Sequence, residues 1–461
     1  MRICACVYLL LSLVMPLWSQ DSARTQSATP EADASATVAQ SPADSSDDMV
    51  TPTPVSVVGL PLNVAGETEQ KSYIRGGVSF QTAYDTNIFT LSTNVTGVDY
   101  SILPVIDLKL THPRTQLQLF YSPGFTMYQG YADLNHTDHD LGLKLYYRLS
   151  PHLTLRLGES FRKTGYLQSL PDQNDVTSTV GMIQRPNDSI VPPVAELFSN
   201  FSTAEITYQV GPNSMVGAQG AVSQLWYSNS RSLGIAGPQP YGVFDSGTQA
   251  AEGFYVRRLS RRHYIGVNYG FQKLVAHPSP AKTQVHSIVL FYTLYLPQHI
   301  SLSFFAGPQH SDTFTFVSPI SSRVRMWSPQ AGASFGYQVR RMSFITSFAR
   351  TVTEGGGLSS AVRSSSATAS LRFFMAKRLT CGVAGEYSTN ATLNLPMVVA
   401  NSGHTVLGSV FVEQLLGQHM GLHFGFSRLH QTYNIVSISN APNQTRVEAS
   451  IGYKFDKPLG R

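Results

Sequence analysis

The sequence predicts an all-β protein, a transmembrane antiparallel up-and-down β-barrel of about 18 strands, with 16 as the alternative. Three observations lead to this prediction. Apolar residues recur at every second position along most of the chain, short turns alternate with longer loops, and no long apolar run follows the N-terminus.

The hairpin at residues 141–162 shows the repeating unit. Apolar side chains occupy every second position from Leu141 to Leu149, and most of those from Leu153 to Phe161, on either side of a Ser-Pro-His turn. A period of two predicts strands with one apolar and one polar face. In a soluble sandwich the apolar face would meet a core. In a barrel it would meet lipid, and the polar face would line a wet lumen.

Composition narrows the class of membrane protein. Charged residues make up 13% of the 461 residues and aromatic residues 11%, and the mean hydropathy is −0.07. A bundle of membrane-spanning helices would need several runs of about 20 apolar residues. Because only helices and closed barrels satisfy their backbone in lipid, a membrane protein with this composition is a barrel.

The N-terminus predicts export from the cytoplasm. Arg2 and the apolar run that follows are typical of a signal peptide over residues 1–20. Residues 21–70 are rich in Ser, Thr, Ala and Pro, and eight acidic residues against Arg24 give them a net charge of −7, which predicts a disordered periplasmic tail. The barrel is expected over residues 71–461. Of the three cysteines only Cys381 lies beyond the signal peptide, so no intrachain disulfide is expected.

Alternation predicts eighteen strands after the tail. They are Ser72 to Tyr84, Tyr100 to Leu110, Gln116 to Met127, Asp140 to Leu149, Leu153 to Tyr166, Phe201 to Val210, Met215 to Tyr227, Gly247 to Arg258, His263 to Leu274, Gln284 to Leu296, Ile300 to Ser311, Trp327 to Val339, Met342 to Thr353, Arg363 to Met375, Leu379 to Leu393, His404 to Leu415, Met420 to Gln431 and Thr445 to Phe455.

Every second connection between these strands is short. The short turns are at residues 112–114, 150–152, 211–214, 259–262, 297–299, 340–341, 376–378 and 416–419. The longest of the other loops are at 167–200 and 228–246. Bacterial outer-membrane barrels have short periplasmic turns and longer outer loops, whereas a Greek-key fold needs some long crossovers. The short turns are therefore expected in the periplasm.

Cations gather at the short turns. We expect them to form a basic periplasmic rim that faces anionic headgroups or an acidic partner. The alternative is that turns collect charge simply because they are solvated. The rim consists of Arg114, Arg257, Arg258, Arg261, Arg262, Arg340, Arg341, Lys377 and Arg378.

The polar face of the clearest strands predicts a lumen rich in basic side chains. Such a lumen would favour anions or an acidic glycan if it is open, because like charges set the local potential. A packed, plugged or merely solvated lumen is the alternative. The lumen-lining candidates are Asp107, Lys109, Lys144, Arg148, Arg156, Arg162, Arg372, Glu448 and Lys454.

The densest group of potentially catalytic residues is His136, Asp138, His139 and Asp140. No second group supplies a nucleophile, base and oxyanion donors, so loop polarity explains the cluster better than catalysis or a metal site. Glu159 lies on the apolar face of its strand, where a bulge or an interface edge is expected. We expect no catalytic residue, metal or cofactor, and no motif predicts nucleic-acid binding.

The last predicted strand ends in Tyr453-Lys454-Phe455, which resembles the C-terminal assembly signal of outer-membrane barrels, although six residues follow Phe455. A broader resemblance is carried by GGVSFQTAYDTNIF, DYSILPVIDLKL, THPRTQLQLFYSPGFTMYQGY and NHTDHDLGLKLYYRLSPHLTLRLGESFR. These runs resemble the N-terminal part of outer-membrane β-barrel proteins associated with bacterial exopolysaccharide or exosortase-type loci. The resemblance implies a location and a context, but supplies no catalytic residues.

Together these observations predict a non-enzymatic, porin-like barrel in the outer membrane, a pore or component of exopolysaccharide export or surface assembly. Expected partners are outer-membrane lipids, the barrel-assembly machinery and an anionic polysaccharide or small anions. A plugged structural or adhesive barrel is the first alternative. An outer-membrane hydrolase using residues 136–140 is the second.

Overall fold

The computed structural model describes residues 72–89, 94–165, 189–190, 196–228, 245–277, 282–297, 299–317, 320–356, 361–393, 402–435, 438–440 and 443–459. The predicted signal peptide and acidic tail lie outside the described residues, as do most of the predicted loops at 167–200 and 228–246. No helix in the described part of the chain is long and apolar enough to cross a membrane.

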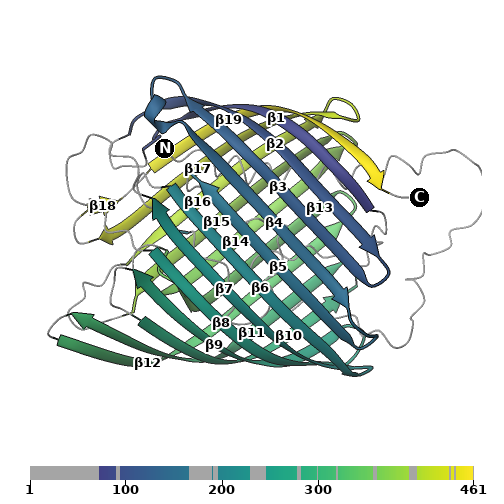
Figure 1. The fold of residues 1–461 in the computed structure, drawn as a ribbon, viewed down its shortest axis with the longest axis vertical. Coiled ribbons are helices and arrows are strands. Elements are labelled where there is room, and N and C mark those ends of the chain that lie inside the picture. The colour runs from purple at the N-terminus through teal and green to yellow at the C-terminus, as the bar shows by residue number, and fades with distance from the viewer. Residues whose placement is uncertain are drawn as a thin grey trace, which may run out of the picture.

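Eighteen antiparallel strands form one closed ring, in which consecutive strands pair and β19 closes the ring against β1 (Figure 1). The strands are β1 (Ser72–Asp85), β2 (Gly97–His112), β3 (Thr115–Tyr128), β4 (His136–Arg148), β5 (Leu153–Thr164), β6 (Glu196–Gly211), β7 (Ser214–Ser228), β8 (Asp245–Arg258), β9 (His263–His277), β10 (Lys282–Leu296), β11 (Ile300–Val317), β12 (Ile320–Val339), β13 (Met342–Thr353), β14 (Val362–Ala376), β15 (Leu379–Thr392), β16 (Ser402–Leu415), β17 (Met420–Ile435) and β19 (Asn443–Leu459).

The predicted fold class is confirmed, and the eighteen predicted strands are present in the predicted order. Two short elements were not predicted: η1 (Ala132–Leu134) precedes β4, and β18 (Ile438–Asn440) pairs only with the end of β17. Strands β11 and β12 are longer than predicted, because their ladder continues to the pair Val317 and Ile320. The prediction of a long loop over residues 312–326 is therefore wrong.

The chain enters and leaves the barrel at one end. Ser72 pairs with Leu459, and the eight predicted short turns connect strands at this same end, which we call the short-turn end. The opposite edge is the long-loop end. Loop lengths there are less regular than predicted, since only residues 278–281 and 318–319 separate the strands of two hairpins.

The two faces of each strand have opposite polarity, as β1 illustrates. Phe80 and Tyr84 are 54% and 47% exposed, whereas Gln81 and Asp85 are 6% and 0% exposed. Large apolar side chains thus cover the outside, and polar side chains fill the inside. A soluble protein would show the reverse, so the outer face is suited to lipid. The chain is an outer-membrane β-barrel.

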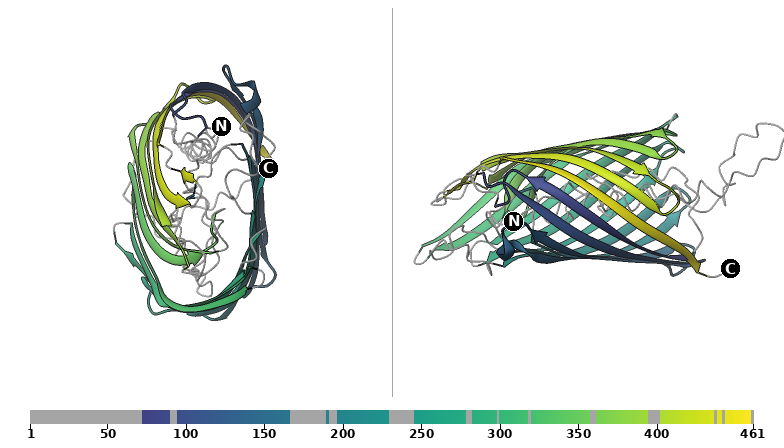
Figure 2. Two further views of the ribbon diagram at one scale, coloured as in Figure 1. Left: turned by 90° about the vertical axis from the view of Figure 1, so that its left-hand side faces the viewer. Right: turned by 90° about the horizontal axis from the view of Figure 1, so that it is seen from above.

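Seen along its length, the barrel is flattened (Figure 2). One long side carries the early strands and the other carries β13 to β17, while β19 and β1 close one curved end. Flattening brings inward side chains from opposite walls close together. The lumen is therefore shaped by contacts across it as well as by pairing around it.

Candidate functional site

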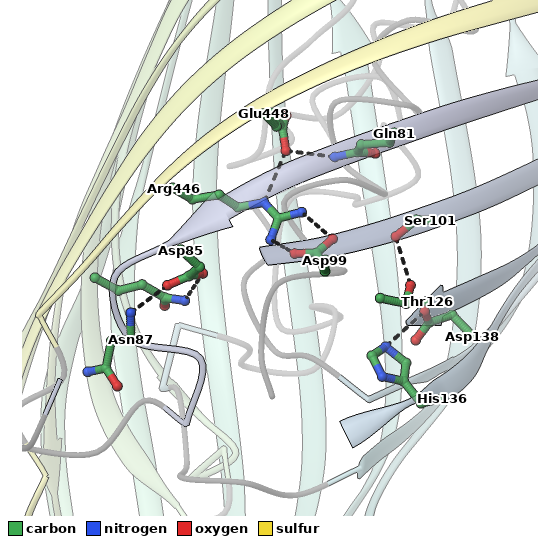
Figure 3. Close-up of polar contacts among 11 residues, drawn as sticks. Gln81, Asp85, Asn87, Asp99, Ser101, Thr126, His136, Asp138, Arg446 and Glu448 are labelled. Atoms are coloured by element: carbon green, nitrogen blue, oxygen red, sulfur yellow. Dashed lines mark hydrogen bonds and ion pairs between the residues drawn. The ribbon is translucent and has the colours of Figure 1, made fainter. Parts of the chain in front are cut away.

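A buried ionic cluster lies where the barrel closes, at the long-loop end of β19, β1 and β2 (Figure 3). The Arg446 guanidinium donates to Asp99 at 2.9 Å and 3.4 Å, and to Glu448 at 3.1 Å. The side chains of Arg446 and Asp99 are fully buried. Gln81 on β1 donates to Glu448 at 2.9 Å. We call Arg446, Asp99, Glu448 and Gln81 the closure cluster.

Neighbouring polar contacts extend this cluster toward the long-loop end (Figure 3). Asp85 accepts hydrogen bonds from the Gln444 side chain and, at 2.7 Å, from the Asn87 backbone. His136 Nε2 lies 3.2 Å from Asp138 Oδ2, and both side chains are almost fully buried. Asp138 also accepts the backbone N–H of Gly165 at 2.9 Å. These contacts fix the ends of β1, β4 and β5.

Inward charges continue down the same wall toward the short-turn end. Arg75 on β1 contacts Asp456 on β19 at 2.6 Å and Asp107 on β2 at 3.7 Å. Asp107 also accepts a hydrogen bond from Gln118 on β3 at 3.1 Å. Carboxylates on two neighbouring strands thus flank one guanidinium. We call the inward faces of β19 and β1 to β6 the ionic wall.

Side chains on β4 to β6 are the most exposed part of the ionic wall. Lys144 is exposed although it points inward, and the Arg156 side chain is 38% exposed while it pairs with Glu205 at 2.6 Å. Arg162 lies 3.8 Å from Asp140 and is 22% exposed. These exposures contrast with the closure cluster, whose four residues are all buried. Solvent therefore reaches the ionic wall beside β4 and β5.

On the other side of the lumen, buried phenylalanines lie among the inward polar side chains and form a repeated cross-strand pair. In each case an inward phenylalanine lies directly opposite a glycine on the neighbouring strand, and its ring covers that glycine. Such pairing fills the space left by the missing side chain. The pairs are Phe254 with Gly217, Phe291 with Gly266, Phe305 with Gly332 and Phe411 with Gly382.

Apolar side chains also join the two long walls across the lumen. Leu197 on β6 and Leu225 on β7 pack in one buried cluster with Ala384, Leu407 and Leu429 on β15 to β17. These strands are not neighbours in the sheet. We call these five residues the cross-lumen cluster. It brings opposite walls into contact in the long-loop half of the barrel.

A second contact crosses the lumen beside this cluster. Ser189 lies between β5 and β6 in the sequence, yet its hydroxyl accepts a hydrogen bond from Asn390 on β15 at 2.9 Å. Its carbonyl accepts one from Thr405 on β16 at 2.8 Å, and the adjacent Ile190 is 3% exposed. This part of the chain therefore occupies the lumen rather than the outer surface.

The predicted lumen candidates all have inward positions, and the structure gathers most of them on the ionic wall. Asp107, Lys109, Lys144, Arg148, Arg156, Arg162, Glu448 and Lys454 lie there, while Arg372 on β14 lies on the opposite side. Their surroundings differ from the expected basic ring, because Asp99, Asp138, Asp140 and Glu205 also point inward. The wall is mixed in charge, and its cations concentrate toward the short-turn end.

The potentially catalytic cluster is divided by the strand. His136, Asp138 and Asp140 point into the barrel, whereas His139 points outward and lies 3.0 Å from the Tyr121 hydroxyl. The four side chains therefore cannot converge on one substrate. Among the described residues, no three His, Cys, Asp or Glu side chains are placed to hold a metal ion.

Other predicted residues can also be located. The nine rim residues lie in or beside four of the short turns, and all but Arg258 are exposed. Tyr453 and Phe455 lie on the outer face, and β19 continues past them to Leu459. Of the two expectations for Glu159, a bulge or an interface edge, the bulge is absent, because Glu159 lies opposite Leu143 on β4 and Ser202 on β6 without a register shift. Cys381 is a free thiol.

Sequence reasoning missed the centre of the closure cluster. Asp85 and Asp99 lie one residue beyond predicted strand ends, and Arg446 lies one residue inside the last predicted strand. The signal that could have found Arg446 is its parity, since it alternates with Glu448 and Lys454 on the polar face. The cross-lumen contacts had no such signal.

No protein-family model matches the chain, and no curated protein matches it. Solved structures with a similar fold include the ferric citrate transporter FecA in its unliganded form, with 11% identity and a TM-score of 0.45. That match covers 83% of this chain but only 64% of FecA. OccK2 (OpdF) of Pseudomonas aeruginosa, solved with glucuronate, has 12% identity and a TM-score of 0.43, covering 84% and 98%. OpdK of the same organism, solved with vanillate, has 10% identity and a TM-score of 0.40, covering 83% and 99%.

Proposed function

We propose that the barrel is a non-enzymatic pore whose permeation path follows the ionic wall. One observation carries the proposal: the inward-pointing Lys144 is exposed and Arg156 is partly exposed, so charged side chains meet solvent inside the barrel. An inward cation in a packed core would be buried away from solvent. Water beside β4 and β5 is what a permeation path requires.

The proposed solutes are anions. Lys109, Lys144, Arg148, Arg156 and Lys454 lie in the half of the ionic wall nearest the short-turn end, where Asp107, Glu205 and Asp456 are their acidic neighbours. Excess positive charge in a low-dielectric channel raises the local concentration of anions. The basic rim extends the same field into the solvent outside the pore.

An acidic exopolysaccharide is the larger solute that we propose. The resemblance of residues 76–162 to barrels of exopolysaccharide loci supports it, together with the cationic half of the ionic wall. Deleting the gene should reduce surface polysaccharide without reducing its cytoplasmic precursors. Normal surface polysaccharide in the deletion strain would exclude this role and leave a pore for small anions.

Planar-bilayer conductance tests the pore itself. Folded barrel, identified by its heat-modifiable mobility on gels, should give discrete current steps and a reversal potential of the anion-selective sign in a KCl gradient. The control for contaminating channels is protein purified in the same way but left unfolded, which should give no current. Folded protein that gives no current would overturn the pore.

A closed structural or adhesive barrel is the second candidate. The cross-lumen cluster and the Ser189 contacts favour it, because they occupy part of the lumen near the long-loop end. The same conductance measurement separates the two functions. A hydrolase based on residues 136–140 has no such support, because His139 points away from the other three side chains.

We also propose that Tyr453 and Phe455 contact the barrel-assembly machinery. Both are about half exposed on the outer face of β19, the strand that closes the ring. Assembly machinery that first binds the last strand of a barrel would contact these side chains before β19 pairs with β1. Replacing both with alanine should slow the appearance of the heat-modifiable form, while equal assembly rates would exclude the role.

A further inference from the structure

Five cationic or imidazole side chains lie on the outer face of β13 to β17 near the long-loop end. They are Arg350, Arg363, His404, Arg428 and His430, and we call them the outer belt. Arg428 and His430 are exposed, and the other three are partly exposed. All five are on the parity that carries the exposed apolar side chains of their strands, so they lie outside the lumen.

Strand register makes the belt continuous across neighbouring strands. Arg350 lies opposite Ser365, Ser365 opposite Thr389, and Thr389 opposite His404. The rings of His404 and His430 are 5.9 Å apart. Arg428 Nη2 lies 3.5 Å from Asn443 Oδ1 on β19. Cations and hydroxyl donors thus share one row on the surface.

Acidic side chains do not neutralise this row. Among the described residues of β13 to β17, no outward side chain is acidic, because Glu386 and Glu413 point inward. At another place on the outer face an acidic side chain does neutralise a cation: the Arg323 Nε atom contacts both carboxylate oxygens of Asp312, at 2.8 Å and 3.1 Å. The outer belt therefore keeps its positive potential toward the surroundings.

On the same strands, exposed apolar side chains lie next to the outer belt and nearer the middle of the barrel. Val406, Val410 and Phe426 are 40%, 46% and 45% exposed, and Tyr387 lies opposite Val406. A surface that is apolar toward the membrane centre and cationic toward the long-loop end is complementary to the acyl chains and the headgroup of an anionic lipid. Acyl chains would meet the valines and phenylalanine, while an anionic headgroup would meet the belt.

We propose that the outer belt binds a phosphate-bearing acylated glycolipid of the leaflet around the long-loop end. Arginine is suited to phosphate because its guanidinium offers two parallel donors, and Arg363 on β14 and Arg428 on β17 both have this capacity. His404 and His430 supply ring N–H donors between them. The binding site lies outside the barrel, so it is independent of the proposed pore.

Binding is tested with folded barrel in nonionic detergent and lipid A as the probe. Native mass spectrometry or thermophoresis compares the wild type with the triple variant Arg428→Gln, His404→Gln and His430→Gln. We expect the triple variant to bind lipid A about tenfold more weakly or worse. Lys273→Gln is the matched control, because Lys273 is a cation on the outer face of β9, outside the belt.

Two further probes identify the ligand chemistry. Dephosphorylated lipid A should bind weakly to both proteins, and inorganic phosphate alone should not compete at millimolar concentration. Equal binding of lipid A by the triple variant and the wild type would overturn the proposal, as would an equal loss in Lys273→Gln. Competition by inorganic phosphate would assign the belt to free anions instead. Heat-modifiable mobility confirms that each variant is folded.

Discussion

Arg446 on β19 and Asp99 on β2 form a fully buried ion pair, 2.9 Å long, that reaches over β1. Each side of β1 is already paired through its backbone, to β19 on one side and β2 on the other. The ion pair therefore links two strands that share no backbone hydrogen bonds. Because β1 and β19 are the first and last strands, it secures the point where the ring closes.

Replacing Arg446 with methionine should destabilise the closed barrel. The change leaves Asp99 and Glu448 buried without their guanidinium partner, and the loss of one member of a buried pair costs about 3–5 kcal/mol. Urea unfolding in detergent, followed by fluorescence and gel mobility, measures the change. The double variant Arg446→Met with Asp99→Asn should recover part of the lost stability. An unchanged urea midpoint in the single variant would show that the pair contributes nothing to closure.

The phenylalanine–glycine pairs predict that alanine is tolerated less well at the paired glycines than at an unpaired one. An added Cβ at Gly266 would lie 2.6 Å from the Tyr255 carbonyl oxygen, and one at Gly332 would lie 2.7 Å from the Phe348 carbonyl oxygen. Gly266→Ala or Gly332→Ala should therefore destabilise the barrel by about 1–3 kcal/mol. Gly408→Ala is the control, because nothing lies within 4 Å of its added Cβ. Equal urea midpoints for all three variants would contradict the packing argument.

The sequence was sufficient for the strands but not for the shape of the lumen. Alternation and short turns identified eighteen strands because each signal is local, within about ten residues. Arg446 and Asp99 are far apart in the chain, and their contact depends on which strands close the ring. The contact of Leu225 with the opposite wall depends on flattening, which alternation does not encode. The expected basic lumen is a mixed wall in the structure, partly because Asp85 and Asp99 lie one residue beyond the ends of predicted strands.

Reversing one lumen charge should change ion selectivity. Lys144→Glu replaces an exposed inward cation with an anion, so the reversal potential in a KCl gradient should move toward cation selectivity. Lys163→Glu is the matched control, since Lys163 lies on neighbouring β5 but points outward, over the Phe198 ring. A shift of the same size in both variants would mean that Lys144 does not border the ion path.

The basic rim predicts a dependence on lipid charge. Arg261, Arg262, Arg340 and Arg341 lie in two exposed short turns, and each cation near an anionic surface contributes about 1 kcal/mol. Wild-type barrel should fold faster into vesicles containing phosphatidylglycerol than into phosphatidylcholine vesicles, and reversing all four charges should abolish the difference. Salt should weaken the effect by screening. If the reversed variant keeps the wild-type preference, the rim is only a set of solvated turns.

The cross-lumen cluster predicts a variant with a wider path. Leu407 on β16 is 6% exposed and packs in one cluster with Leu197 and Leu225, which belong to the opposite wall. Leu407→Ser removes most of this apolar contact and leaves a hydroxyl that favours water between the walls. Single-channel conductance should therefore rise, while Leu407→Ile, which keeps the volume and the apolar character, should leave it near the wild-type value. Unchanged conductance in Leu407→Ser, with wild-type gel mobility, would mean that ions pass only along the ionic wall and that this contact supports the flattened shape without limiting the pore.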